Sequence, residues 1–255
     1  MEKEQLNVYH RKNPKEYFVG YKFGDNHPQE DKFDDEEMGE SNPKGKVYKG
    51  KLPNGQFIAI KHIYKDIPQA DTFEKEIEII SKIKHKNLVS LLGYCDENGD
   101  KYFVYEYCAN GNLSQMLLGL EDKALTWEQR VKIAYDSIAG LRCLHLYPDG
   151  CTVHRDIKPT NILLTESMEA KLADFGLLRM FKIQDTNVFT EVKGTLGYLD
   201  PDYASQGRLT CSTDVYSFGI VLLQLLSGRR AIDIDQSNRE SLLNKASFLR
   251  ILSFV

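Results

Sequence analysis

The alternation of apolar and polar residues in the first half of the chain predicts a small β-sheet. Residues 47–64, VYKGKLPNGQFIAIKHIY, place two β-rich runs on either side of Pro-Asn-Gly at 53–55, a turn that favours a hairpin. LVSLLGYC at 88–95 and KYFVYEYC at 101–108 are separated by polar residues and indicate two further strands. We therefore expect four strands in this part of the chain.

Between the two pairs of strands, the pattern changes to that of one amphipathic helix. Residues 70–87 carry apolar side chains three or four positions apart, and Asp71 is the expected N-cap. The apolar positions are Phe73, Ile77, Ile80 and Ile83. Helical periods return at 109–120 and 125–147, and the apolar run 218–226 indicates a buried helix. A ligand is expected in the crevice between the sheet layer and the helical layer.

Composition and charge narrow the function classes without naming one. Of the 255 residues, 42% are hydrophobic and 27% are charged, and the net charge is −4. This balance is ordinary for a soluble protein with a substantial core, and it gives no general attraction to nucleic acid or anionic lipid. The run 218–226 is too short to cross a bilayer, which needs about 20 residues, so no transmembrane segment is expected in this chain.

The cysteines and the N-terminus indicate where the chain works. Five cysteines are spread along the chain without a C-x-x-C pair, so we expect neither a disulfide framework nor a zinc site, and a reducing compartment is the simplest setting. The N-terminus has no apolar h-region, and Glu2 stands where a myristoylated chain has glycine. Residues 1–35 are polar without a hydrophobic period, and we interpret them as an extension.

One short segment, EEMGESNPKGKVYKG at 36–50, is open to three interpretations from its own residues. Gly39 and Gly45 flank a polar stretch that suits a phosphate-binding loop, a damaged version of such a loop, or an ordinary turn. The choice among the three depends on motifs that come later in the chain.

The segment VHRDIKPTNILL carries the most specific pattern in the sequence. His-Arg-Asp at 154–156, followed five positions later by Asn161, matches the catalytic loop H-R-D-x-x-x-x-N. Asp-Phe-Gly follows at 174–176, and Ala-Ile-Lys at 59–61 comes earlier, as in V-A-I-K. Together with Glu76 on the amphipathic helix, four parts occur in order on the expected elements. The chain therefore resembles the protein kinase family.

Further segments narrow the resemblance to plant receptor-like and receptor-like cytoplasmic kinases. They are HKNLVSLLGYC, LTWEQRVKIA, KGTLGYLDPDY and DVYSFGIVLLQLLSGRRAID, and they lie within residues 36–235. The resemblance implies an α+β, bilobal protein-kinase-like fold, with a small antiparallel β-sheet N-lobe and one helix at 36–107. A mainly helical C-lobe at 108–255 would be incomplete, because the chain ends before the last helices of the family.

The resemblance also implies a role for each polar motif residue in phosphoryl transfer that uses ATP and Mg²⁺. Lys61 would hold the α- and β-phosphates while paired with Glu76. Asn161 and Asp174 would bind Mg²⁺ through oxygen atoms. Asp156 would be the catalytic base that accepts or orients the proton of the substrate hydroxyl.

The surroundings of the nucleotide and of the acceptor follow from the same resemblance. Lys158 would stabilise charge on the γ-phosphate, and its presence indicates serine and threonine acceptors. The residues expected to bind the nucleotide further include Gly39, Ser41, Gly45, Val47, Ala59, the gatekeeper Tyr105 and the hinge residues Glu106, Tyr107 and Cys108.

The activation segment, residues 174–202, contains three threonines that differ in their expected roles. Thr190 and then Thr186 are candidates for a phosphate that would pair with Arg155. Thr195 is expected to pack against the catalytic loop. Asp214 would anchor the backbone of that loop from a buried helix.

Three features depart from the family pattern. The opening loop lacks at least one of its three glycines, and Pro43 near its tip offers no N–H. Asp-Pro-Asp at 200–202 replaces a Pro-Glu that pairs with a later arginine. Because the final helices of the C-lobe are expected to be missing, we predict exposed apolar surface, with either low stability or a requirement for a chaperone or partner.

The leading hypothesis is an ATP- and Mg²⁺-dependent protein serine/threonine kinase in intracellular signalling. Its partners would be a protein substrate and an upstream receptor or kinase, and it would work in the cytoplasm or at the plasma membrane through a partner. The alternative is a pseudokinase or truncated product that acts as a protein-binding regulatory module. A nucleotide hydrolase without a protein acceptor is the third hypothesis.

Overall fold

The computed structural model describes seven segments of the chain, and they form two compact units. The described residues are 46–52, 54–64, 70–97, 99–117, 124–181, 188–235 and 238–241. The first unit comprises Met1–Lys84 and Val89–Cys108, and the second comprises His85–Leu88 and Ala109–Val255. The expected extension at 1–35 and the predicted site residues Gly39, Ser41, Gly45 and Thr186 lie outside the described residues.

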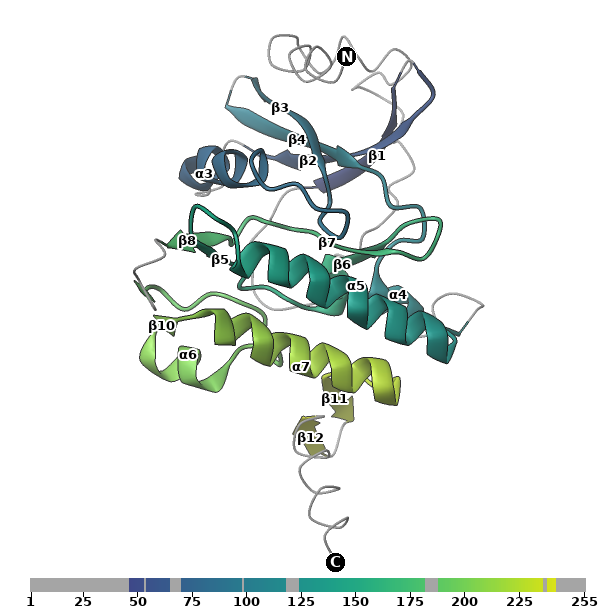
Figure 1. The fold of residues 1–255 in the computed structure, drawn as a ribbon, viewed down its shortest axis with the longest axis vertical. Coiled ribbons are helices and arrows are strands. Elements are labelled where there is room, and N and C mark those ends of the chain that lie inside the picture. The colour runs from purple at the N-terminus through teal and green to yellow at the C-terminus, as the bar shows by residue number, and fades with distance from the viewer. Residues whose placement is uncertain are drawn as a thin grey trace, which may run out of the picture. The chain divides into compact units, whose positions relative to one another are not determined.

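The first unit contains a four-stranded antiparallel sheet with the strand order β1-β2-β4-β3 (Figure 1). Its strands are β1 (Lys46–Lys51), β2 (Phe57–Ile63), β3 (Leu91–Glu97) and β4 (Asp100–Glu106). The turn between β1 and β2 contains Gly55, whose φ of 90° is a conformation that glycine adopts at little cost. The predicted hairpin and the two further strands are therefore confirmed.

Each face of this sheet has its own apolar layer. One layer contains the buried residues Leu52, Ile58, Ile60, Tyr102 and Val104. In another contact the ring of Phe73 on α3 (Ala70–Ile80) lies 4.6 Å from the ring of Phe103 on β4. This contact places Phe73, the first residue of the predicted apolar stripe, against the sheet.

The helix α3 is shorter than its sequence pattern predicts. It ends at Ile80, and Ile83 is buried beyond the helix instead of on it. The expected N-cap Asp71 lies inside the helix, which begins at Ala70. The helical period continues to residue 87, but His85–Leu88 belong to the second unit, where Asn87 accepts a backbone hydrogen bond of 2.9 Å from Leu172. Tertiary pairing therefore overrides the helical pattern.

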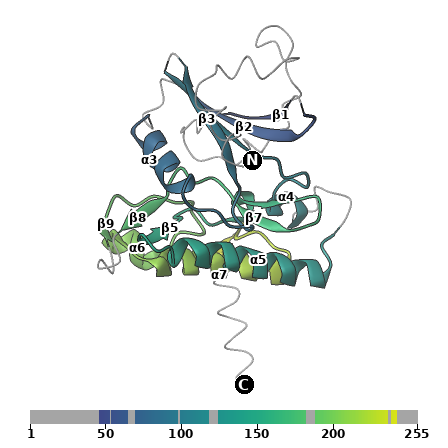
Figure 2. The same ribbon diagram turned by 45° about the horizontal axis from the view of Figure 1, so that its top comes forward.

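Helices in the second unit begin and end at sequence signals that are easy to recognise. They are α4 (Leu113–Leu117), α5 (Trp127–His145), α6 (Pro201–Gln206) and α7 (Cys211–Ser227). Thr126 and Gln129 form a capping box at the start of α5, and Gly228 ends α7 with a φ of 67°. The long helices α5 and α7 run side by side (Figures 1 and 2).

Short strands position the loops between the helices of the second unit. They form the pairs β5 (Cys151–Val153) with β8 (Arg179–Phe181), β6 (Ile162–Leu164) with β7 (Ala170–Leu172), β9 (Val188–Phe189) with β10 (Arg208–Leu209), and β11 (Ile232–Asp235) with β12 (Asn238–Ser241). The segment after β5 leads through the 3-10 helix η1 (Pro159–Asn161) into β6. The HRD and DFG motifs thus directly follow β5 and β7.

One expectation about the cysteines is wrong. The sulfur atoms of Cys151 and Cys211 are joined in a disulfide, although the two residues are 60 positions apart. Cys95, Cys108 and Cys143 are not part of this disulfide. Spacing rules detect pairs that are close in sequence, whereas here the fold brings the start of β5 to the start of α7.

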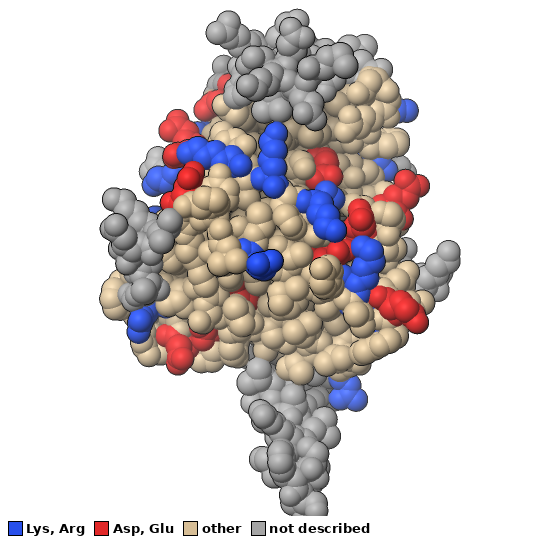
Figure 3. All heavy atoms as spheres, in the orientation of Figure 1, with Lys and Arg blue, Asp and Glu red and all other residues tan. Residues whose placement is uncertain are grey.

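A stripe of apolar side chains lies exposed along α5. Its members Trp127, Val131, Tyr135 and Ile138 are between 50% and 68% exposed. In Figure 3 the surface over α5 and α7 carries few charged side chains. Within the described segments, no helix has the length and apolar character needed to span a membrane.

Candidate active site

In the first unit, β2 presents the expected phosphate-binding lysine on the face opposite the buried isoleucines. Ile58 and Ile60 are buried, whereas Ala59 and Lys61 between and beside them are partly exposed, as strand alternation requires. Val47 on β1 is paired with Lys61 in the sheet register. The residues predicted to contact the nucleotide from β1 and β2 therefore share one face of the sheet.

Glu76 on α3 is buried and has a partner that the sequence did not reveal. The hydroxyl of Tyr105, the expected gatekeeper, donates a hydrogen bond of 3.1 Å to the Glu76 carboxylate. Both side chains are buried, so this bond helps to offset the cost of removing the carboxylate from water. The ion pair between Glu76 and Lys61 remains a prediction.

The expected hinge leaves the sheet at the end of β4. The backbone N–H of Ser90 donates to the Glu106 carboxylate at 2.7 Å, which fixes the strand end. The Tyr107 ring lies 4.5 Å below the Lys49 ammonium. Cys108 is only 4% exposed, so its thiol is buried.

In the second unit, three side chains surround the carboxylate of Asp156. The Thr195 hydroxyl donates to Oδ1, and the Asn161 amide donates to Oδ2 at 3.0 Å. The Lys158 ammonium lies 3.6 Å from Oδ2 and donates to the Thr195 hydroxyl at 2.9 Å. The expected base, the expected γ-phosphate lysine and the activation segment are thus joined in one network. The contact of Thr195 with the catalytic loop is confirmed.

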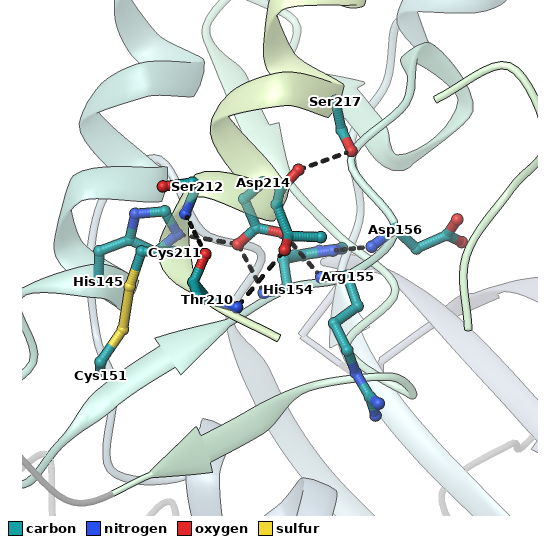
Figure 4. Close-up of polar contacts among 11 residues, drawn as sticks. His145, Cys151, His154, Arg155, Asp156, Thr210, Cys211, Ser212, Asp214 and Ser217 are labelled. Carbon is teal, nitrogen blue, oxygen red and sulfur yellow. Dashed lines mark hydrogen bonds and ion pairs between the residues drawn. A yellow bond between two sulfur atoms is a disulfide. The ribbon is translucent and has the colours of Figure 1, made fainter. Parts of the chain in front are cut away.

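Asp214 holds the backbone of the catalytic loop from inside α7 (Figure 4). Its two carboxylate oxygens accept the N–H groups of His154 and Arg155, both at 2.8 Å. The His145 ring from α5 lies 2.8 Å from the same carboxylate. Because Asp214 is fully buried, these partners are needed to compensate its charge. The predicted anchoring role is confirmed.

Two residues of the motifs adopt backbone conformations that are rare outside glycine. Arg155 has a φ of 69° and Asp174 has a φ of 60°. Such conformations cost free energy and persist where the surroundings impose them. At Arg155, the surroundings include the bond from its N–H to Asp214 and a bond from its guanidinium to the carbonyl of Leu177.

Asn161 and Asp174 are the residues expected to bind Mg²⁺, and both carry the oxygen atoms that this ion prefers. The backbone N–H of Ala173 donates to the Asn161 carbonyl at 2.9 Å, so the neighbouring Asp174 is tied to the Asn161 segment. The Asn161 amide nitrogen is used by Asp156, which leaves its amide oxygen as the atom for a cation. Two protein ligands suit Mg²⁺, which keeps waters and phosphate oxygens as its other ligands.

His154 and Phe175 pack together beside this set. Their ring centroids are 5.8 Å apart, and His154 also contacts the Ala173 carbonyl at 3.0 Å. Both residues are buried, so their rings pack in the interior of the second unit.

The structure describes the activation segment over residues 174–181 and 188–202. The backbone N–H of Thr190 donates to Gly207 at 3.0 Å, and Thr190 is partly buried. Asp200 caps α6 by accepting the N–H of Asp202 at 3.0 Å. The Asp202 side chain is exposed and forms no ion pair with any residue that the structure describes.

Comparison with known proteins agrees with this arrangement of residues. The chain matches the model of the protein kinase domain over residues 34–253. It belongs to the protein kinase family. The Asp156 network and the Asp214 anchor are therefore parts of a kinase domain.

Relatives of this kinase domain include plant receptor-like kinases. A putative proline-rich receptor-like protein kinase of Arabidopsis thaliana is 46% identical over 79% of this chain and 29% of the relative. A probable leucine-rich repeat receptor-like protein kinase of the same plant is 48% identical over 74% of this chain and 20% of the relative. A probable serine/threonine-protein kinase is 43% identical over 82% of this chain and 57% of the relative. The chain thus spans 20% to 57% of these three proteins.

Proposed function

We propose that this chain transfers the γ-phosphoryl group of ATP to serine or threonine hydroxyls of a protein substrate. The observation that carries the proposal is the orientation of the Asp156 carboxylate by Thr195, Asn161 and Lys158. A carboxylate held in this way is placed to accept or orient the proton of an incoming hydroxyl. Membership of the protein kinase family supports the same assignment.

Each remaining residue of the network has a role in positioning or in neutralising charge. Lys158 would stabilise the charge of the transferring group, and its bond to Thr195 fixes its ammonium. Asn161 and Asp174 would hold Mg²⁺, which neutralises phosphate charge when bound. Lys61 would bind the α- and β-phosphates from β2, and the backbone of residues 106–108 would bind adenine.

The cellular location and the partners of this activity are also proposed here. The relatives are named as receptor-like kinases or as a serine/threonine-protein kinase, which supports a role in signalling. We propose a location inside the cell, a protein substrate, and an upstream receptor or kinase that phosphorylates Thr190 or Thr186. Arg155 would pair with that phosphate.

The substitution Asp156→Asn tests the proposal. Asparagine retains the shape of the side chain but cannot accept the proton, so phosphate incorporation with Mg-ATP should fall by about 10²- to 10⁴-fold. The measurement is incorporation of labelled phosphate into the protein itself and into a generic protein substrate. Equal incorporation by both forms would show that Asp156 is not the base.

A thermal-shift series separates loss of chemistry from loss of nucleotide. Binding to the folded state raises the unfolding temperature, so Mg-ATP should stabilise both the original protein and the Asp156→Asn form. If Mg-ATP stabilises the protein but no phosphate is transferred, the chain is a binding module and not an enzyme. Without stabilisation or transfer, the proposed use of ATP fails.

A further inference from the structure

The disulfide connects the two segments that hold the catalytic loop. Cys151 is the first residue of β5 and lies three positions before His154. Cys211 is the first residue of α7 and lies three positions before Asp214. Figure 4 shows the disulfide beside the contacts of Asp214 with the loop. The sulfur bridge and the Asp214 carboxylate therefore tie the same two segments together.

The disulfide lies at the edge of an apolar cluster and is only partly buried. Cys151 and Cys211 are partly buried and pack against the buried side chains of Val153, Tyr203 and Leu209. Their Cα atoms are 7.4 Å apart, just outside the 4.4–6.8 Å of most disulfides. Asp214 lies within one helical turn of Cys211 on the same helix.

We propose that Cys151 and Cys211 form a reversible redox site that controls how firmly Asp214 holds the catalytic loop. In the bonded state the His154 and Arg155 amides are hydrogen-bonded to Asp214, as the structure shows. In the dithiol state the first turn of α7 is released from β5, and these two amides exchange with solvent more readily.

The oxidant is a peroxide, and the reaction balances in two steps. One thiol releases its proton, and the resulting thiolate attacks hydrogen peroxide, breaks its O–O bond and becomes a sulfenic acid; the leaving hydroxide takes up the released proton and forms water. The second thiol then attacks the sulfenic sulfur, which forms the S–S bond and releases a second water. A dithiol reductant returns two electrons and two protons and restores both thiols.

The reversible character rests on the intracellular location proposed above. Disulfides in reducing compartments are usually transient, so a bridge there is expected to act as a sensor and not as a permanent staple. Cys151 and Cys211 are partly exposed, as is Cys143. Burial raises the pKa of the Cys143 thiol, which lowers the fraction of its reactive thiolate.

Peptide mapping without reductant tests the bond. The full chain is fully reduced, treated with hydrogen peroxide, alkylated and digested with trypsin. Cys143 and Cys151 fall between Arg142 and Arg155 in one tryptic peptide, so the experiment uses the Cys143→Ser protein as well. We expect a linked pair of peptides that contains Cys211 in both proteins. Absence of this pair after peroxide would overturn the proposal.

Hydrogen exchange tests the control of the loop, with no need for kinase activity. The amides of His154 and Arg155 should exchange at least tenfold faster in the reduced protein than in the oxidised one. Cys211→Ser should exchange at the fast rate under both conditions, while the matched control Cys95→Ser should respond like the original protein. Equal exchange in the two redox states of the original protein would overturn the proposal even where the bond forms.

Both readouts remain informative if the chain transfers no phosphate. A protein that forms the bond and changes its amide exchange, but transfers no phosphate, retains the redox site and contradicts only the proposed function. A protein that transfers phosphate and shows neither change retains the function and loses the redox site.

Discussion

At the scale of single residues, several hydrogen bonds of the second unit hold the Asp156 side chain and the backbone next to it in place. Thr195 and Asn161 donate hydrogen bonds to the Asp156 side chain. The Asp214 carboxylate accepts hydrogen bonds from the backbone N–H groups of the two residues that precede Asp156. A base that is positioned before substrate arrives avoids the cost of ordering it during the reaction. Arg155 keeps an unfavourable φ of 69° because the hydrogen bond of its N–H to Asp214 holds the backbone in that conformation.

His62 in the first unit leads to a prediction about pH. Its ring lies 4.2 Å from the ring of Tyr64 and 4.4 Å from that of Tyr102. Nε2 is buried and 3.6 Å from the Asp100 carboxylate, too far for a hydrogen bond. Burial lowers the pKa of His62 from its ordinary value of 6.5, and the attraction of Asp100 opposes this only in part.

The sign of the effect follows from the lowered pKa. Below pH 6.5 the unfolded chain takes up a proton that folded His62 resists, so stability falls as the pH drops from 6.5 to the folded pKa. Above pH 6.5 both states are neutral and His62 contributes no pH dependence. We expect His62→Gln to lose less stability than the original protein between pH 7.5 and pH 5.5, measured by urea unfolding.

His85 provides a second test of the same effect. Its pKa is also lowered, first by burial and then by Lys86 and Lys171, so His85→Gln should reduce the pH dependence as well. The double variant should show the smallest loss of stability at low pH. The His62 explanation is wrong if His62→Gln and the original protein lose equal stability over this range.

At the residue scale, the sequence motifs predicted which residues belong to the site better than they predicted which side chains contact one another. Asp156, Asp174 and Asp214 were predicted from short patterns, because each pattern specifies a residue type at a fixed spacing. The hydrogen bond from Tyr105 to Glu76 was not predicted, because it depends on how α3 packs across 29 positions of sequence. No spacing rule specifies which hydroxyl reaches a given carboxylate in a packed layer.

At the scale of elements, two glycines in long helices give opposite predictions for the same substitution. A Cβ on Gly140 in α5 would lie 2.5 Å from the carbonyl oxygen of Asn87, whereas a Cβ on Gly219 in α7 would meet no atom within 4 Å. Alanine is favoured over glycine in a helix by about 1 kcal/mol where space allows. Alanine at position 140 therefore tests the effect of packing on stability, and alanine at position 219 tests the effect of helix propensity.

Gly140→Ala should destabilise the protein, and Gly219→Ala should stabilise it. We expect a loss of about 1–3 kcal/mol in the free energy of unfolding for Gly140→Ala, because its contact is a backbone atom that cannot rotate away. For Gly219→Ala we expect a gain of about 0.5–1 kcal/mol. Denaturant unfolding measures both, and equal signs for the two variants would contradict the packing argument.

The elements themselves were predictable in proportion to their length. The helices α5 and α7 and the four strands of the first unit carry enough residues for a period to be visible. The pairs formed by β5 to β10 have two or three residues per strand, too few for alternation to stand out. The early end of α3 escaped prediction because His85–Leu88 pair with β7, a contact that the local sequence does not express.

At the scale of the whole molecule, the apolar stripe on α5 predicts self-association. Replacing Val131 and Ile138 by glutamate breaks the stripe at two positions that are each 50% exposed. Glu at 138 also gains a favourable pair with Arg142 one turn later. We expect less association at high concentration by light scattering, with the free energy of unfolding changed by less than about 0.5 kcal/mol.

The buried face of the same helix supplies the control. Ile133 is 0% exposed, so Ile133→Glu should prevent cooperative folding instead of improving solubility. If Val131→Glu with Ile138→Glu associates as strongly as the original protein, the stripe is not the surface through which molecules meet.

The four residues His85–Leu88 decide how this molecule can be divided. Asn87 accepts the N–H of Leu172, donates its amide to the carbonyl of Ala170, and lies against Gly140. A fragment that began at Ala109 would keep every catalytic-loop residue and still lose an edge partner of β7 and a neighbour of α5. The second unit is therefore not separable by one cut in the gene, and a split protein would need to carry His85–Leu88 with it, for example by circular permutation.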